Sequence, residues 1–388
     1  MAITVTTDLP PITLSGNPMV LVANSDDFEY DLYTIFLYIF IKIGEDFVNI
    51  HTDSVQVDSE GNAQFDLSGI ISRQSAPTLP NPIADLTIEK DESAVVIYKY
   101  ALADGYGIPF TINEPEITSD ELFAIPGGLA DQVLEAIEAG DSTIASYLLD
   151  SGVILTNAPA NKRVYPGQPE VIRFCNLTDV SLNIKLKVEQ FLFSEADSIV
   201  TEILTAELDA YSLYSMNVTP AIAFELDDDC HRWEVFLTDD NNDDITERLS
   251  YVHPEFPAVQ TKTIIFQNSL GGFDTVAAIG AMAQVADGQG IGGYRPLRTI
   301  MRNVLIPVQD RRTATNKFSG ALGYFSHEEF QWLQEFFLSE QRFIEVDEQL
   351  LPITLLNSDM PNGTDEPPAE LAIELSVGLA QRYYTKPR

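Results

Sequence analysis

The chain has 388 residues, 45% of them hydrophobic, so it is long enough to bury more than one apolar core. Its 59 Asp and Glu residues outnumber 22 Lys and Arg residues, which gives a formal net charge of -37. A surface this acidic repels the phosphates of nucleic acids and of anionic lipids, so we exclude sequence-specific recognition of DNA or RNA and expect no membrane insertion. In the simplest interpretation, the negative net charge keeps the protein soluble. A more specific interpretation is the wall of a conduit through which DNA slides without sticking.

The start of the chain, its most apolar run and its cysteines bear on where the protein is made. Residues 1–11 contain no basic segment followed by an apolar one, so we expect no secretory signal. Residues 32–43 are apolar but too few to cross a bilayer, and their β-branched and aromatic side chains favour a buried strand. Cys175 and Cys230 are too few for a disulfide framework or a zinc site. A bond between them depends on the fold, and a reducing compartment fits better.

Residues 1–115 predict a β-sandwich domain made of short strands separated by turns. The clearest feature is a predicted hairpin, in which residues 55–57 and 63–67 flank the turn signal at residues 59–62. Another strand is expected over residues 95–101.

Residues 116–152 predict a helical insertion or linker. Thr118 and Glu121 have the spacing of a capping box, which is typical of the start of a helix. Apolar residues then recur at helical spacing as far as Ile137, and Gly140 is a typical stop. A second short helix is expected to end at Gly152.

Residues 153–265 predict a second β-sandwich domain, because residues 182–188 alternate apolar and polar side chains. Residues 266–388 predict an α+β C-terminal region. It begins with a strand and a glycine-rich loop at residues 288–293. Its helix is expected to start at the capping box of Ser326 and Glu329, with two further strands after it. The predicted fold class is therefore mainly β, with a short helical insertion.

The motifs associated with cofactors are incomplete. Gly288, Gly290 and Gly293 have the spacing of a dinucleotide fingerprint, but Pro296 follows where a helix is required and no βαβ unit surrounds them. None of the four histidines has metal-ligand spacing to another His or Cys; they are His51, His231, His253 and His327.

One acidic segment has the alternate spacing of a calcium loop, at Asp239, Asn241 and Asp243. Asp244 and Ser250 stand where such a loop needs glycine and glutamate, so an exposed turn is the favoured interpretation. No pair of carboxylates is singled out for hydrolysis. We therefore expect a protein that is not an enzyme and has no catalytic, cofactor-binding or metal-binding residues.

The segment from Asn268 to Thr275 resembles a recurring motif of tail proteins of phages that infect Bacteroidetes-type hosts. By itself it predicts only a strand end, a Gly-Gly turn with positive φ, and Phe273 packing back. Other segments resemble the same group in the same order: residues 14–18, 65–71, 123–129, 148–169, 343–346 and 351–354.

The resemblance implies a virion structural protein of the tail, such as a distal tail, baseplate or tail-adaptor component. It implies assembly into a homo-oligomeric ring with other tail proteins, after synthesis in the host cytoplasm. The alternative is a receptor-binding or adhesin-like β module that recognises a cell-surface glycan, for which the 38 aromatic residues (21 Phe, 15 Tyr and 2 Trp) would supply a platform. A hydrolase hidden in a β scaffold is the third hypothesis and requires a cleft with paired carboxylates of raised pKa.

Overall fold

The computed structural model of the chain describes twelve ranges. They are residues 3–26, 29–80, 88–115, 117–140, 143–150, 154–194, 197–254, 260–298, 303–322, 326–346, 349–356 and 371–381. The fold is mainly β, as the sequence predicts.

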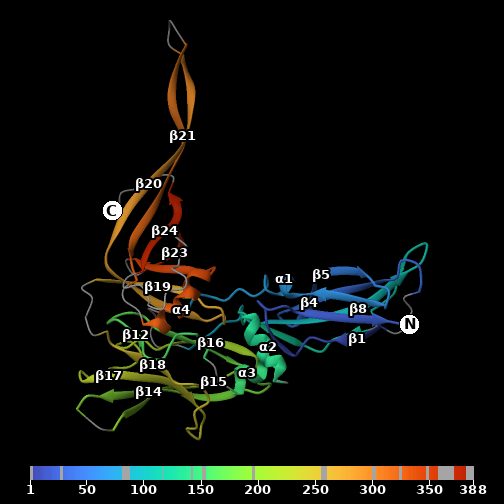
Figure 1. The fold of residues 1–388 in the computed structure, drawn as a ribbon, viewed down its shortest axis with the longest axis horizontal. Helices are drawn as coiled ribbons and strands as arrows, with labels where there is room; N and C mark the ends of the chain where they lie inside the picture. Colours follow the sequence, from blue (N-terminus) through green and yellow to red (C-terminus); the bar gives the residue numbers. More distant parts are fainter. Residues whose placement is uncertain are drawn as a thin grey trace. The chain divides into compact units, whose positions relative to one another are not determined.

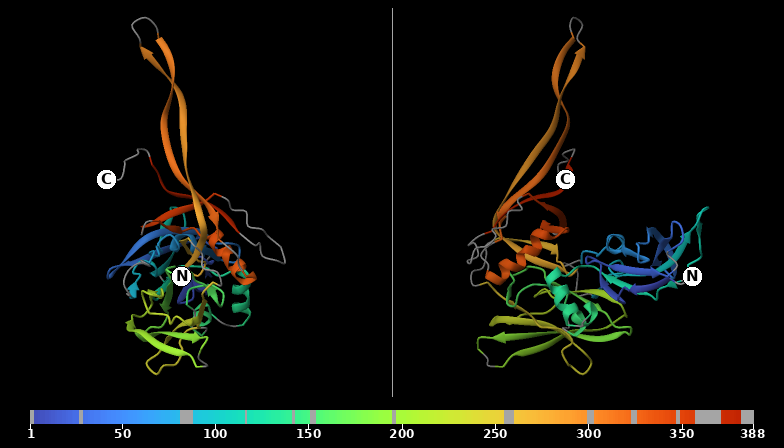
Figure 2. Two further views of the ribbon diagram at one scale, coloured as in Figure 1. Left: turned by 90° about the vertical axis from the view of Figure 1, so that its left-hand side faces the viewer. Right: turned by 45° about the vertical axis from the view of Figure 1, so that its right-hand side comes forward.

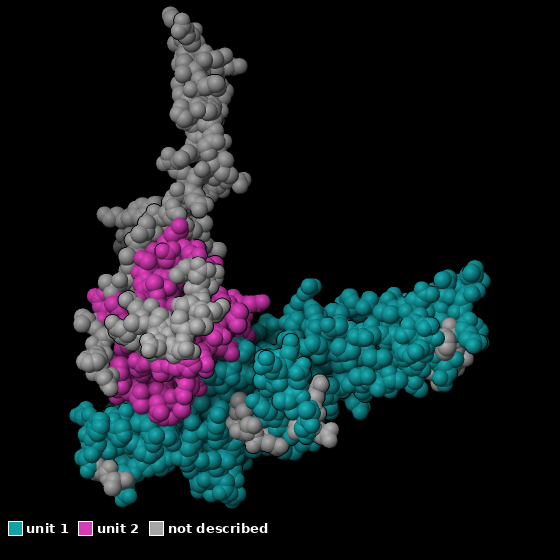
Figure 3. Space-filling model, in the orientation of Figure 1, with its two compact units in different colours: residues 1–157, 171–249, 268–273 teal, residues 158–170, 250–267, 274–388 magenta. Residues whose placement is uncertain are grey.

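The chain forms two compact units (Figure 3). Unit 1 contains Met1–Asn157, Val171–Leu249 and Asn268–Phe273, and unit 2 contains Ala158–Glu170, Ser250–Gln267 and Asp274–Arg388. Each unit therefore gathers residues from several of the consecutive segments into which the sequence analysis divides the chain.

The N-terminal part of unit 1 is a β-sandwich (Figure 1). One sheet has the order β1-β3-β6 and consists of β1 (Ile3–Thr7), β3 (Val20–Ser25) and β6 (Asn62–Asp66). The other has the order β2-β11-β8-β4-β5 and consists of β2 (Ile12–Leu14), β11 (Leu122–Ile125), β8 (Val96–Tyr106), β4 (Thr34–Ile43) and β5 (Asp46–Gln56), with β9 (Thr111–Ile112) and β10 (Ile117–Thr118) paired to β8. Leu21 and Phe65 from the first sheet share a core with Leu37 and Tyr98 from the second.

The apolar run predicted as a buried strand is β4, which lies between β5 and β8. Its alternate residues Ile35, Leu37 and Ile39 are buried. Burial of each such side chain contributes about 1.5–3 kcal/mol, so this strand anchors the sandwich core.

The predicted hairpin of residues 55–67 is wrong, because its two strands belong to different sheets. β5 pairs with β4, and β6 pairs with β3. The turn itself is held locally by Asp58, whose carboxylate accepts hydrogen bonds from the backbone N–H groups of Glu60 (2.8 Å) and Asn62 (2.9 Å). The predicted turn is therefore correct, but the strands before and after it form their hydrogen bonds in two different sheets of the sandwich.

The predicted capping box at Thr118 is also wrong, because residues 117–118 form β10 and residues 122–125 form β11. The paired strand β8 supplies hydrogen bonds to both, which decides against a helix there. The helices of this segment begin later, as α2 (Asp131–Ala139) and α3 (Ile144–Asp150). A short α1 (Ser68–Ile71) follows β6.

The remainder of unit 1 contains two further sheets. The first has the order β13-β16-β7, formed by β13 (Val171–Asn176), β16 (Ser212–Asn217) and β7 (Ile88–Lys90). In the second, β14 (Leu182–Leu192) lies between β15 (Ile199–Leu208) and β17 (Cys230–Thr238). The alternation predicted over residues 182–188 is confirmed, since Ile184, Leu186 and Val188 are buried.

Within the described residues, unit 2 is a closed barrel accompanied by the helix α4. The barrel order is β19-β20-β21-β24-β23-β22, formed by β19 (Thr261–Gln267), β20 (Phe273–Arg298), β21 (Asn303–Ala321), β24 (Ala372–Gln381), β23 (Gln349–Leu355) and β22 (Arg342–Val346). The helix α4 (His327–Leu338) begins at the capping box of Ser326 and Glu329, as predicted. It packs Leu333 and Phe336 onto the barrel residues Phe266 and Ile344. A short parallel pair joins β12 (Lys162–Arg163) to β18 (Leu249–Val252).

Strands β20 and β21 are longer than the other barrel strands and run on together as a two-stranded ribbon (Figures 1 and 2). Their pairing extends from Ile279 with Ala321 to Arg298 with Asn303. Strand β24 pairs with β21 between Ala314 and Ala321. The predicted glycine-rich loop at residues 288–293 is wrong, because these residues lie within β20 opposite β21. Pairing with β21 supplies the order that a glycine-rich segment lacks by itself, and one of the two register shifts in this pairing falls between Ile291 and Gly292.

No helix within the described ranges is long and apolar enough to span a membrane.

The Asp58 turn gives a prediction about pH. Backbone hydrogen bonds hold the pKa of Asp58 below its ordinary value of 3.8, so this carboxylate stabilises the fold above that value and the contribution is lost as the pH falls. Asp58→Ala is expected to lower stability to urea at pH 7, with the difference from wild type shrinking towards pH 3. Asp58→Asn, which keeps an acceptor without the charge, serves as the control. Equal stability of wild type and Asp58→Ala at pH 7 would contradict the role of this turn.

Candidate functional sites

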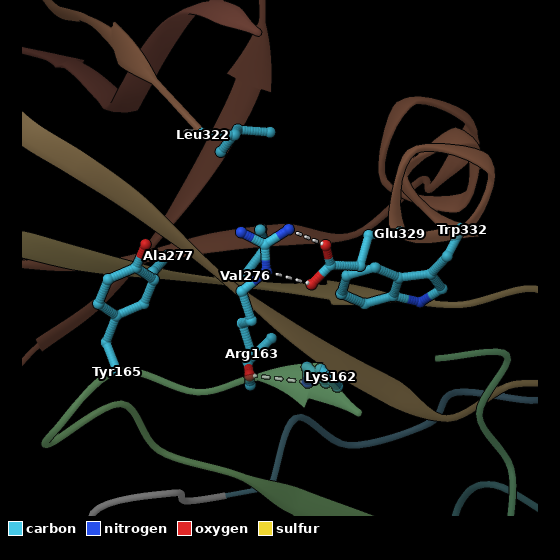
Figure 4. Close-up of a pocket in the computed structure, with 9 residues that line it drawn as sticks. Lys162, Arg163, Tyr165, Val276, Ala277, Leu322, Glu329 and Trp332 are labelled. Atoms are coloured by element: carbon cyan, nitrogen blue, oxygen red, sulfur yellow. Dashed lines mark hydrogen bonds and ion pairs between the residues drawn. The ribbon is translucent and has the colours of Figure 1, made fainter. Parts of the chain in front are cut away.

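Unit 2 contains a buried polar cluster beside the barrel, and Figure 4 shows Lys162 and the residues around the small cavity next to it. Lys162, from β12, donates to Glu170 (Nζ to Oε2, 2.8 Å) and to Thr275 Oγ1 on β20 (3.2 Å). Gln168 Nε2 donates to Glu170 Oε1 (3.0 Å) and to Thr275 Oγ1 (2.9 Å), and the Thr275 hydroxyl donates to Glu170. Lys162 and Glu170 are each 4% exposed, so the pair is desolvated and needs these additional hydrogen bonds.

A second ion pair joins the same cluster to α4. Arg163 binds Glu329 through two guanidinium nitrogens, and Nε lies 3.1 Å from Oε1. The Glu329 carboxylate also accepts the backbone N–H of Ser326 (2.8 Å), which closes the cap of the helix. Trp332 Nε1 donates to Asp274 Oδ2 (3.1 Å). One glutamate therefore fixes both the start of α4 and the position of Arg163 (Figure 4).

The electrostatics of this cluster are those of a matched ion pair. Burial raises the pKa of Glu170, and the nearby Lys162 ammonium and Thr275 hydroxyl oppose that shift. The cavity lined by Lys162, Thr275 and Trp332 measures about 20 Å³, which is room for a single water molecule. Such a space holds a bridging water and is too small for an organic substrate.

The corresponding centre of unit 1 is Arg173 on β13. Its guanidinium donates to Asp91 Oδ2 (2.7 Å), Ser215 Oγ (3.0 Å) and the carbonyls of Thr78 and Gly271 (the latter 3.4 Å). Burial lowers the pKa of Arg173, and the Asp91 carboxylate opposes that shift. A cavity of about 240 Å³ adjoins it, but the guanidinium is already paired. Arg173 thus joins four separate segments of unit 1.

The part of the Asn268–Thr275 motif that belongs to unit 1, Asn268–Phe273, forms a close backbone crossing there. Asn268 Nδ2 donates to Leu155 O (2.8 Å), and Asn268 Oδ1 accepts the N–H of Gly272 (2.8 Å). A Cβ added at Gly272 would lie 1.8 Å from Leu155 O, so only glycine fits. Gly271 has φ +82 and Phe273 is buried, as the sequence predicts. The closeness of residue 155 had no sequence signal, because that contact joins segments distant in the chain.

The structure separates the other candidates. Cys175 and Cys230 are free and buried, and burial raises the pKa of the Cys175 thiol to about 12. Asp239 accepts the backbone N–H of Asp243 (2.8 Å), so that acidic segment is the exposed turn that we favoured. His51 lies in β5, His231 in β17 and His327 in α4, while His253 follows β18. Within the described ranges no three His, Cys, Asp or Glu side chains are grouped as they would be around a metal ion.

Comparisons with known proteins do not assign this chain to a family. No family model matches the chain, and no curated protein is significantly similar to it. Among solved structures, the Pseudomonas aeruginosa CupB2 chaperone matches at 10% identity and TM-score 0.17, over 64% of this chain and 99% of that one. Escherichia coli alpha-2-macroglobulin matches at 9% identity and a TM-score of 0.20, over 83% of this chain and 22% of that one. A marsupial T cell receptor matches at 9% identity and a TM-score of 0.18, over 82% of this chain and 95% of that one. At such TM-scores these similarities carry no argument.

The Arg173 centre predicts a large loss of stability when its partner is removed. Asp91→Ala leaves a buried guanidinium unpaired, and we expect it to lower the free energy of unfolding by about 3–5 kcal/mol. Glu121→Ala, which removes a half-exposed partner of Lys42, is the control and is expected to cost about 0–1 kcal/mol. Urea denaturation of the full chain measures both. Equal effects of the two substitutions would show that Arg173 is not a stabilising centre.

The backbone crossing gives a second prediction about stability. Gly272→Ala places a Cβ against Leu155 O and is expected to destabilise unit 1 by about 1–3 kcal/mol or more. Gly69→Ala in α1 meets nothing within 4 Å and is expected to be neutral or slightly stabilising. Thermal unfolding followed by circular dichroism compares them, and an unchanged melting temperature for Gly272→Ala would contradict the close approach.

Proposed function

We propose that this chain is a virion structural protein of a phage tail, as a distal tail, baseplate or tail-adaptor component. In this proposal it acts by assembling into a homo-oligomeric ring with other tail proteins. The observation that carries the proposal is the β20–β21 ribbon.

The outer part of the ribbon has an unusual backbone environment. The outer part extends from the pair Gly288–Ala314 to the pair Arg298–Asn303. Among the described residues of this part, β20 and β21 pair only with each other, apart from the pairing of Ala314 with Gln381 of β24. A two-stranded hairpin is marginally stable in water by itself, and its two outer edges carry unpaired N–H and C=O groups. Such edges are templates for pairing with another chain.

A ring satisfies these edges. When identical subunits are arranged around a rotation axis, each ribbon has a neighbour on both sides, and closure leaves no free edge. The polar centres of the two units fit this role, because their hydrogen bonds connect segments that are distant in the chain. The acidic composition supports an added role as a conduit wall that does not adsorb DNA.

One observation favours the alternative, a receptor-binding module that recognises a cell-surface glycan. The Phe193 ring is 78% exposed and lies 4.5 Å from the ring of His231. Exposed rings are typical platforms for the apolar faces of sugars. Binding to a glycan array that is lost on Phe193→Ala would favour this alternative.

Shortening the ribbon tests the ring proposal. Residues 289–313 are replaced by Asn-Gly, which joins Gly288 to Ala314, two residues that already face each other. We expect the shortened chain to keep its circular dichroism spectrum and to lose the oligomers that the intact chain forms. Light scattering and electron microscopy of both chains measure this.

Rings that persist in the shortened chain would show that the ribbon does not mediate assembly. An intact chain that stays monomeric at every concentration would count against the ring itself.

A further inference from the structure

One end of the N-terminal sandwich of unit 1 exposes an apolar surface that we call the tip. It is formed by the segment before β4 and by the turn that follows β8 (Figure 1). Five large apolar or aromatic side chains are exposed there: Tyr30, Leu32, Ile108, Phe110 and Ile112. Ile108, at 81% exposure, is the most accessible of them. Several exposed apolar side chains on one end are typical of an interaction site, whereas single ones are common on any surface.

The tip stands on a rigid base. Gly107 N donates to Asp31 O (2.9 Å), which joins the two segments, and the Tyr30 and Tyr106 rings stack at 4.9 Å. Beneath them, the buried Tyr33 hydroxyl lies 2.8 Å from Asp104 Oδ2 and also accepts from Ser25. Segments that are already held in place lose little conformational entropy on binding, which favours a docking role for the tip.

The backbone at Leu32 adds to this. Leu32 has φ +60, a left-handed conformation that is unfavourable for a bulky residue. Its side chain is nevertheless exposed, so packing in the core does not offset the cost of this backbone conformation. Hydrogen bonds on either side, from Gly107 and from the Thr34 hydroxyl, hold the segment in place.

The charge of the tip indicates the chemistry of its partner. Residues 26–33 and 104–114 contain no Lys or Arg, and Asp26, Glu29, Asp31 and Glu114 lie among the apolar residues. A carboxylate-rich apolar surface is repelled by anionic lipid and by nucleic acid. It is complementary to an apolar surface with basic residues, because opposite charges steer association and fix its register.

The same chain contains one segment of that composition. Between residues 281 and 317, which include the ribbon, the basic residues are Arg295, Arg298, Arg302, Arg311, Arg312 and Lys317, and the acidic residues are Asp287 and Asp310. The segment has six basic and two acidic residues in a chain of net charge -37, and it is also rich in apolar residues. It is thus the opposite of the tip in charge.

We infer that the tip of one copy docks on the β20–β21 ribbon of a second copy. The contact joins two different surfaces, so it is heterologous and generates a ring when the rotation between copies closes. This inference rests on the proposed ring assembly and deepens it by naming the surface that the ribbon meets. It goes beyond ribbon-to-ribbon pairing, which involves no residue of unit 1.

A matched pair of substitutions tests the apolar part. Ile108→Ser and Leu338→Ser each change an apolar side chain that is 81% exposed, but Leu338 lies at the end of α4 in unit 2. We expect Ile108→Ser to weaken self-association of the full chain about ten- to a hundredfold in sedimentation velocity, as loss of one buried side chain implies. Leu338→Ser is expected to leave it unchanged. Equal effects of the two would overturn the inference.

A charge exchange tests the partner. Glu29→Lys with Asp31→Lys in one chain is expected to prevent assembly, and Arg311→Glu with Arg312→Glu to do the same. All four substitutions together restore the opposite charges and are expected to restore assembly. Failure of the combined variant to assemble, with each unit folded by circular dichroism, would overturn the docking.

The outcomes separate this inference from the ring proposal. If shortening the ribbon abolishes the rings but the tip variants still form them, the ring stands and the tip is not its contact. If the unaltered chain forms no oligomer, both proposals fall.

Discussion

The structure of unit 1 depends on one buried guanidinium. Arg173 is nearly surrounded by protein, and it reaches a loop at Thr78, the carboxylate of Asp91, the hydroxyl of Ser215 and the backbone of Gly271. Asp91 in turn accepts the N–H groups of Thr78 (2.7 Å) and Ser93 (3.2 Å). A buried charge is stable only when all of its partners are in place, so formation of this centre couples four segments that are far apart in the chain.

Unit 2 uses the same principle with different residues. Lys162 and Glu170 neutralise each other beside β20, and Glu329 serves both Arg163 and the N-terminus of α4. In both centres a buried cation is paired with a carboxylate of the protein itself, Arg173 with Asp91 and Lys162 with Glu170. Buried pairs of this kind contribute modestly to net stability, and in some proteins they favour one arrangement of the chain over others. That property suits the proposed role of the chain as a subunit of a ring.

The surfaces left over after folding are the ones that indicate assembly. Two outer edges of the ribbon lack a third strand among the described pairings, and the tip holds apolar side chains in water on a rigid base. Both features are costly for an isolated chain, because unpaired edges and exposed apolar groups favour aggregation. The proposed contact between copies would remove both features together. In the proposed assembly, the excess of carboxylates elsewhere on the chain would keep copies apart except where a basic segment meets an acidic one.

The sequence by itself determined the mainly β class, the strand predicted at residues 32–43 (of which 34–43 form β4), the alternation of β14 and the capped start of α4, because each follows from local periodicity or local hydrogen bonding. It also located the turn at Asp58 and the motif around Gly271, without indicating what either contacts. Only the tertiary structure decided which strands pair. Residues 117–118, 122–125 and 288–293 became strands because β8 and β21 supplied their hydrogen bonds, and hydrogen bonds between distant segments leave no trace in local sequence. The same reason applies to the Arg173 and Lys162 centres, whose partners are brought together by the fold alone.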